Sequence, residues 1–294
     1  MKKLTSPSKW FLATRPWSFP ASVMPLLLGT VSASVNTGNF NLPNFLMALF
    51  AMLCLHSAGN VISDIFDFRK GLDNQITPTS GALARGLLTP KQMWAWASIL
   101  IGTGSAIGIY LALTITPLIL WIGLAGVIIG CSYTWLKYHA LGDLTVFVNF
   151  ATLGTLGGWM VQTAHFSWLP IFWSIPLGLL ITAILHANNW RDTENDQKCG
   201  IQTVALRIGH KASAQYYRLL LLLALATAIA LGQPLTTLLT LAALPKMAAL
   251  WKTAKNYLIS KDPQLVIDLD GRTAQLNLIF GLLYILGIGL GSFL

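Results

Sequence analysis

Two groups of acidic residues, far apart in the chain, have the types and spacing that a metal site needs. Each group begins with an asparagine and continues with aspartates at helical intervals. The members are Asn60, Asp64, Asp67 and Asp73 in the first group and Asn188, Asp192 and Asp196 in the second. Side chains four residues apart lie on the same face of a helix, so we expect each group to present its oxygens together.

Oxygen ligands without thiolates favour Mg²⁺ over zinc. Mg²⁺ in proteins is commonly held by one or two carboxylates together with substrate phosphates. We therefore predict a magnesium site that is built from two helices and suited to a bound diphosphate. The predicted metal ligands are Asp64, Asp67, Asp73, Asp192 and Asp196.

Basic and polar side chains are expected beside the aspartates, where they would bind and neutralise a diphosphate. The predicted substrate-binding residues are Asn60, Arg85, Tyr133, Lys137, Asp143, Asn188 and Arg191, and the predicted catalytic residues are Asp64, Asp67, Asp192, Asp196 and Lys137. Tyr133 precedes Lys137 by one helical turn, which brings the two polar tips together at a helix end. His56 and His186 are expected to support the site by hydrogen bonds rather than as ligands.

Two other interpretations stay open. The carboxylates could be solvated helix-end groups, with Asp64 paired to Arg69 and Asp192 paired to Arg191. The same asparagine-to-aspartate spacing in both groups favours the metal site instead. A cation or proton pathway of a transporter is disfavoured because no acidic residue lies in the middle of an expected membrane span.

The composition indicates an integral membrane protein. The chain has 294 residues, of which 54% are hydrophobic and 10% charged, whereas soluble domains carry about 25% charged residues. The net charge of +9 comes from basic residues in short linkers, which indicates positive-inside topology rather than nucleic-acid binding. The three cysteines show no paired spacing, so a disulfide framework or zinc site is not expected.

We expect nine membrane-spanning helices in a single domain, residues 1–294, of an all-α protein. The expected spans are 17–36, 43–66, 92–113, 115–136, 144–164, 169–190, 212–232, 235–256 and 273–293. Linkers after the odd-numbered spans hold no charged residue, and linkers after the even-numbered spans hold nearly all of them. The Lys/Arg bias predicts a cytoplasmic N-terminus, an outside C-terminus and a site that faces the cytoplasm from the inner membrane.

At these residues the chain resembles the UbiA superfamily of intramembrane prenyltransferases, over almost its full length. Asp64-Ile-Phe-Asp67 is similar to the family's first acidic motif, and Asp192-Thr-Glu-Asn-Asp196 is similar to its second. Tyr133 to Lys137 matches its YxxxK element, and Arg15-Pro16-Trp17 resembles its usual opening. The resemblance implies a nine-helix bundle with a lateral opening to lipid. It also implies Mg²⁺-dependent prenyl transfer from a polyprenyl diphosphate to an aromatic acceptor, with release of pyrophosphate.

Further motifs resemble the branch that prenylates 1,4-dihydroxy-2-naphthoate in menaquinone synthesis. They are Asp67 to Asp73, Ala140 to Asp143, Asn188 to Asp192 and Thr203 to Gly209. Two details depart from the pattern: Ser63 replaces the family's usual asparagine, and the Tyr133–Lys137 element lacks the glycines common in that branch. Acceptors such as 4-hydroxybenzoate, homogentisate or another quinone or lipid precursor therefore remain alternatives. A CDP-alcohol phosphotransferase is disfavoured because its acidic signature is absent.

Overall fold

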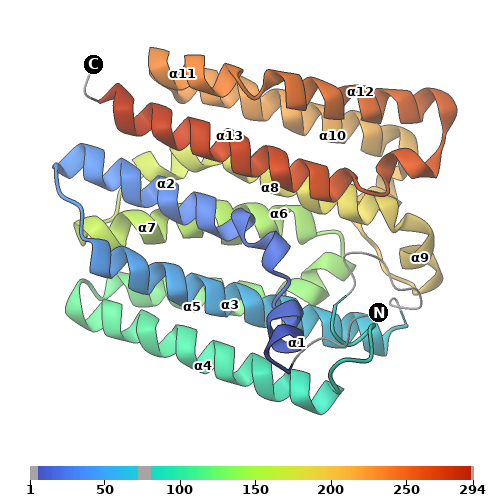
Figure 1. The fold of residues 1–294 in the computed structure, drawn as a ribbon, viewed down its shortest axis with the longest axis horizontal. Helices are drawn as coiled ribbons and strands as arrows, with labels where there is room; N and C mark the ends of the chain where they lie inside the picture. Colours follow the sequence, from blue (N-terminus) through green and yellow to red (C-terminus); the bar gives the residue numbers. More distant parts are fainter. Residues whose placement is uncertain (1–5, 72–80, 293–294) are drawn as a thin grey trace.

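The computed structural model describes residues 6–71 and 81–292, and within them the chain is helical without a strand (Figure 1). The expected all-α class is confirmed. Asp73, one of the predicted metal ligands, lies outside the described residues. The elements in chain order are α1 (Ser6–Ala13), η1 (Pro16–Ser18), α2 (Pro20–Thr37), α3 (Leu42–Arg69), α4 (Pro90–Thr114), α5 (Leu118–Tyr138), α6 (Gly142–Val146), η2 (Phe147–Thr152), α7 (Leu153–Thr163), α8 (Leu169–Arg191), α9 (Thr193–Lys198), α10 (Val204–Leu231), α11 (Pro234–Leu241), α12 (Leu244–Ser260), η3 (Pro263–Val266) and α13 (Leu269–Gly291).

Short polar side chains define where several long helices begin. The Asn41 side chain accepts the backbone N–H of Asn44 at the start of α3. Thr89 and Gln92 form a reciprocal capping box at the start of α4. Such caps satisfy N–H groups that have no partner within the helix.

The described part of the chain contains eight helices long and apolar enough to cross a membrane, or nine spans if one bent pair is counted as one. The expected number of crossings is therefore confirmed with that pair included. The expected straight span 235–256 was wrong in its shape, because α11 and α12 meet at 54°. Pro245 lies in the first turn of α12, where proline lacks the N–H that would continue α11 into α12.

The helices lie side by side in a bundle, and small residues allow some of them to approach closely. A Cβ atom at Gly29 of α2 would lie 1.9 Å from the Thr155 carbonyl oxygen. A Cβ atom at Gly158 of α7 would lie 2.2 Å from the Leu26 carbonyl oxygen. The backbones of α2 and α7 therefore touch, as small residues permit in membrane bundles.

One end of the bundle gathers the segments that carry the acidic groups. In Figure 1, α9 lies at the right-hand end, and the last turns of α13 lie at the left-hand end. The linker after α5 joins this right-hand cluster, because Gln202 N–H donates to the Tyr138 carbonyl oxygen at 3.0 Å. Residues at the ends of α3, α5 and α8 are thus brought to a common place.

Candidate active site

A cavity of about 1420 Å³ runs into the bundle from this end. It exceeds the roughly 300–1,000 Å³ typical of a single small-molecule site, so it has room for two substrates. Most predicted site residues line it, namely Asn60, Asp67, Tyr133, Lys137, Asn188, Arg191, Asp192 and Asp196. Asp64, Arg85 and Asp143 are not part of its lining.

In the first acidic group, Asp67 faces the cavity and Asp64 lies beneath its surface. The Tyr138 hydroxyl donates to Asp67 Oδ1 at 2.7 Å. Asp64 is fully buried and forms an ion pair with Arg15. Its expected alternative partner, Arg69, lies over the Trp94 ring instead.

Gly81 lies against Asp64. A Cβ atom at Gly81 would lie 1.8 Å from Asp64 Oδ2, so a larger residue there would displace the carboxylate. On the other side, Arg15 reaches Asp64 from a backbone with φ of 52°, a conformation that non-glycine residues rarely adopt. Such strain is found where the surroundings hold a functional side chain in place.

The second acidic group is organised around Arg191. Its guanidinium donates to both carboxylate oxygens of Asp192, at 2.8 and 2.9 Å. It also donates to Asp270 Oδ2 at 2.7 Å, and Asn188 donates to the same oxygen at 3.3 Å. The pairing of Asp192 with Arg191, weighed above as an alternative to a metal site, is therefore present in the structure.

Asp196 provides the clearest sign that the two groups share one electrostatic environment. Burial raises the pKa of Asp196 to about 6, with Asp192 and Asp67 acting in the same direction and Lys137 and a hydrogen bond from Thr203 opposing them. Asp67 belongs to α3, so carboxylates from both groups act on one another across the cavity. A bound cation would relieve this repulsion.

The donor set suits a hard cation that arrives with a phosphate ligand. Within residues 6–71 and 81–292, no three His, Cys, Asp or Glu side chains form a ready-made metal site. Mg²⁺ does not need such a cage, because it keeps water and phosphate among its ligands. Buried carboxylates around a cavity that also holds Lys137 and Arg191 fit a metal-bound diphosphate.

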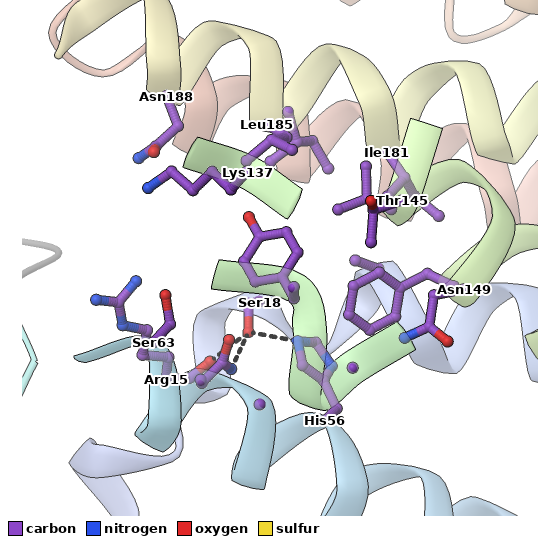
Figure 2. Close-up of a pocket in the computed structure, with 18 of the residues that line it drawn as sticks. Arg15, Ser18, His56, Ser63, Lys137, Thr145, Asn149, Ile181, Leu185 and Asn188 are labelled. Atoms are coloured by element: carbon purple, nitrogen blue, oxygen red, sulfur yellow. Dashed lines mark hydrogen bonds between the residues drawn. The ribbon is translucent and has the colours of Figure 1, made fainter. Parts of the chain in front are cut away.

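Beyond the charged end, the cavity wall contains a hydrogen-bonded group centred on a histidine. His56 lies between two hydroxyls, with Nε2 at 3.2 Å from Ser18 Oγ and Nδ1 at 2.8 Å from Ser22 Oγ (Figure 2). Asn60 donates to the same Ser18 oxygen at 3.0 Å. These bonds connect α2, η1 and α3 at the cavity wall.

Asp143 lies behind the opposite wall. It is buried in α6, and its Oδ2 is 3.4 Å from Nδ1 of His186 on α8. A Cβ atom at Gly142 would lie 3.3 Å from the Lys137 Cα atom. Asp143 is therefore placed to hold the turn that supports Lys137.

The sequence did not identify three side chains that hold the acidic residues. Arg15 belongs to the opening motif but not to the predicted site, and Tyr138 directly follows the predicted Lys137. Asp270 lies before the expected start of the last span at 273, whereas α13 begins at Leu269. A signal existed for Asp270, since the chain has only ten acidic residues and this one begins an apolar helix.

Comparison with known proteins decides the family. The model of the UbiA prenyltransferase family matches residues 22–265. The chain belongs to the UbiA prenyltransferase family. The resemblance expected from the motifs is thereby confirmed, and so is the enzyme class, a prenyltransferase.

Curated UbiA relatives match nearly the whole chain. The chain is 35% identical to the UbiA prenyltransferase domain-containing protein 1 homolog of Drosophila melanogaster, over 94% of this chain and 78% of that protein. It is 33% identical to UbiA prenyltransferase domain-containing protein 1 of Xenopus tropicalis, over 95% and 81% of the two chains.

Solved structures share the UbiA fold at low sequence identity. A UbiA homologue from Aeropyrum pernix K1 is similar with a TM-score of 0.68 and 18% identity, covering 92% of this chain and 97% of that one. A UbiA homologue from Archaeoglobus fulgidus, bound to DMAPP and Mg²⁺, is similar with a TM-score of 0.61 and 15% identity, covering 94% and 99%. The nine-span interpretation, with the bent pair as one span, therefore agrees with a UbiA-type membrane fold.

Proposed function

We propose that this enzyme transfers a polyprenyl group from a polyprenyl diphosphate to an aromatic acceptor, 1,4-dihydroxy-2-naphthoate, and releases pyrophosphate. One observation carries the proposal: Asp67 from α3 and Asp192 and Asp196 from the α8–α9 end line one cavity together with Lys137 and Arg191. A diphosphate is the ligand whose charge and oxygen donors match that arrangement.

Mg²⁺ is the proposed cofactor. Homologues from Archaeoglobus fulgidus were solved with DMAPP and Mg²⁺ and with GPP and Mg²⁺, and the carboxylates in this cavity suit the same ion. The proposed ligands are Asp67, Asp192 and Asp196 at the cavity surface, with Asp64 and Asp73 completing the set. The ion would supply positive charge that stabilises the diphosphate as a leaving group.

The chain's own residues then have distinct tasks. Lys137 and Arg191 neutralise the negative charge that gathers on the diphosphate as the allylic C–O bond breaks. Asn60, Asn188 and Tyr133 contribute hydrogen bonds around the head group. The apolar walls exclude water, which would otherwise capture the allylic cation. The acceptor ring attacks the allylic carbon and then loses a proton or carbon dioxide.

Arg85 and Asp143, predicted to bind substrate, receive different proposed roles. Asp143 supports the turn behind Lys137. Arg85 lies between α3 and α4 and is proposed to approach the diphosphate when the substrate is bound. We further propose that residues 1–294 form one domain in the cytoplasmic (inner) membrane, with the cavity mouth towards the cytoplasm, as the basic linkers favour.

The decisive experiment replaces Asp67 or Asp192 by asparagine in membranes supplied with Mg²⁺, geranyl diphosphate and 1,4-dihydroxy-2-naphthoate. Each substitution removes a metal-binding charge, so we expect pyrophosphate release to fall at least about 100-fold. Asp268→Asn changes an exposed carboxylate and should leave the rate unaltered. Wild-type rates in both site variants would refute the assignment.

A panel of acceptors tests the finer proposal. The same membranes are offered 4-hydroxybenzoate, homogentisate and 1,4-dihydroxy-2-naphthoate, and the products are identified by mass spectrometry. We expect the naphthoate to be the preferred acceptor. Preference for another acceptor would leave the prenyltransferase assignment in place and replace the proposed substrate.

A further inference from the structure

The cavity contains a polar side chain that a prenyl diphosphate does not explain. Asn149 lines the cavity from η2, a π-helical turn between α6 and α7. In Figure 2 it appears on the same side of the view as Thr145 and Ile181, away from Lys137 and Asn188. π-Helical turns insert an extra residue into a helix and are frequent at functional sites.

The Asn149 amide has no hydrogen-bond partner in the described part of the chain. Its neighbours on α5 are glycines. Asn149 Oδ1 lies 3.6 Å from where a Cβ atom at Gly126 would be, and Nδ2 lies 3.7 Å from the corresponding position at Gly130. These glycines also line the cavity, so they leave open space next to an amide that can both donate and accept.

Two aromatic rings adjoin this part of the cavity. The ring centroids of Phe150 and His56 are 4.6 Å apart, and both residues line the cavity. Both nitrogens of His56 are occupied. Ser18 Oγ lies 3.2 Å from Nε2 and Ser22 Oγ lies 2.8 Å from Nδ1. His56 is therefore held in a fixed orientation at the cavity wall.

We infer that Asn149, Phe150 and His56 form the subsite for the aromatic acceptor, with the Asn149 amide bonded to an oxygen substituent of the acceptor ring. The inference rests on the proposed function. A prenyl tail consists of carbon and hydrogen only and would leave the amide unpaired, which is unfavourable in an apolar cavity. An oxygen-bearing aromatic ring satisfies the amide and packs against the flat walls.

The first test separates binding of the two substrates. Asn149→Leu keeps the approximate volume and removes the hydrogen-bonding group, so we expect the KM for 1,4-dihydroxy-2-naphthoate to rise about tenfold while the KM for geranyl diphosphate stays unchanged. Gly126→Ser retains Asn149 but offers it a hydroxyl, and it should also raise the acceptor KM. The control Thr227→Val removes a hydroxyl that is bonded to its own helix, at 2.7 Å from the Leu223 oxygen, and should change neither value.

The second test identifies the bonded oxygen through inhibition constants of three analogues, each lacking one oxygen substituent. These are 1-hydroxy-2-naphthoate, 4-hydroxy-2-naphthoate and 1,4-dihydroxynaphthalene. The analogue that lacks the oxygen bonded by Asn149 should have the same inhibition constant for wild type and Asn149→Leu, because that hydrogen bond is absent from both complexes. An unchanged acceptor KM in both variants, or equal weakening of the parent compound and all three analogues, would overturn the subsite.

The two levels of the proposal fail differently. If the wild-type protein releases no pyrophosphate from geranyl diphosphate with any acceptor of the panel, the proposed function is wrong. If it does so and Asn149→Leu and Gly126→Ser both keep the wild-type acceptor KM, the enzyme assignment stands and the subsite is wrong.

Discussion

Arg191 is shared between two carboxylates from different helices. Its guanidinium binds Asp192 through two nitrogens and Asp270 through a third. Asp270 thus competes for the positive charge that would otherwise neutralise Asp192 alone. Because Arg191 divides its hydrogen bonds between two carboxylates, Asp192 is only partly neutralised. Its side chain is 40% exposed and can be reached by a metal ion from the cavity.

The first prediction concerns Asp270→Asn. Without the second carboxylate, Arg191 pairs with Asp192 alone and weakens its attraction for Mg²⁺. We expect the Mg²⁺ concentration for half-maximal activity to rise about tenfold, as for other partners that orient metal ligands. Asp268→Asn is a matched control two residues away, because that carboxylate is exposed and 3.6 Å from Arg272. An unaltered Mg²⁺ requirement would mean that Asp270 has no influence on the metal ligands.

The second prediction concerns the hydroxyl that orients Asp67. Tyr138→Phe removes the 2.7 Å hydrogen bond to Asp67 Oδ1 and keeps the ring. We expect the apparent Mg²⁺ affinity to fall about tenfold, with a smaller effect on the thermal midpoint. Tyr110→Phe, at an exposed position on α4, serves as the control. Equal apparent Mg²⁺ affinities of the two variants would contradict an orienting role for Tyr138.

At this scale the sequence predicted the acidic groups and not their partners. The aspartates follow helical spacing, which is local and can be read from the chain. The partners of Asp64 and Arg191 come from residues far away in sequence, Arg15 and Asp270. Such pairs depend on how the helices are arranged, and a single sequence does not encode that arrangement in any local pattern.

At the scale of elements, the position of η2 depends on the close crossing of α2 and α7. Gly29 and Gly158 let the two backbones touch, and η2 leads directly into α7. The crossing therefore sets where the π-helical turn stands relative to the cavity. Small residues at such a crossing are a requirement of packing, because dispersion contacts take the place of the hydrophobic effect inside a bilayer.

The third prediction tests this crossing. Gly158→Leu places side-chain atoms where the Leu26 carbonyl oxygen lies, because even a Cβ atom would be only 2.2 Å away. We expect a loss of about 1–3 kcal/mol or more of stability, measured as a lowered thermal midpoint in detergent. Gly102→Leu on α4 meets open space and should leave the midpoint nearly unchanged. A midpoint for Gly158→Leu equal to the control would show that the crossing is loose.

The spans themselves could be predicted because apolar length is a strong local signal. Their irregularities could not. The bend between α11 and α12 had a visible cause in Pro245, whereas the π-helical turn of η2 has no residue type that marks it. The short helix α9 lies within a charged linker and is held by tertiary contacts such as the Thr203 bond to Asp196.

At the scale of the whole molecule, charge is concentrated at the end of the bundle that holds the cavity mouth. The linkers at the opposite end, 37–42, 114–118, 163–169 and 231–234, contain no Lys, Arg, Asp or Glu. The short helix α9, which carries part of the second acidic group, lies at the charged end (Figure 1). One face of the membrane therefore receives nearly all basic residues, which is the pattern that fixes orientation during insertion.

The fourth prediction follows from this asymmetry and from an odd number of crossings. The N-terminus is expected in the cytoplasm and the C-terminus outside, with the cavity mouth on the cytoplasmic side. Alkaline phosphatase fused after Leu294 should be active, because it folds only outside, whereas the same enzyme fused within the charged linker 81–89 should be inactive. A green fluorescent protein fusion should give the reverse result at both sites.

If the C-terminal phosphatase fusion is inactive and the fluorescent one bright, either the bent pair α11–α12 does not cross the membrane or the whole bundle is inverted. The linker fusions separate these cases, because only inversion also reverses their signals.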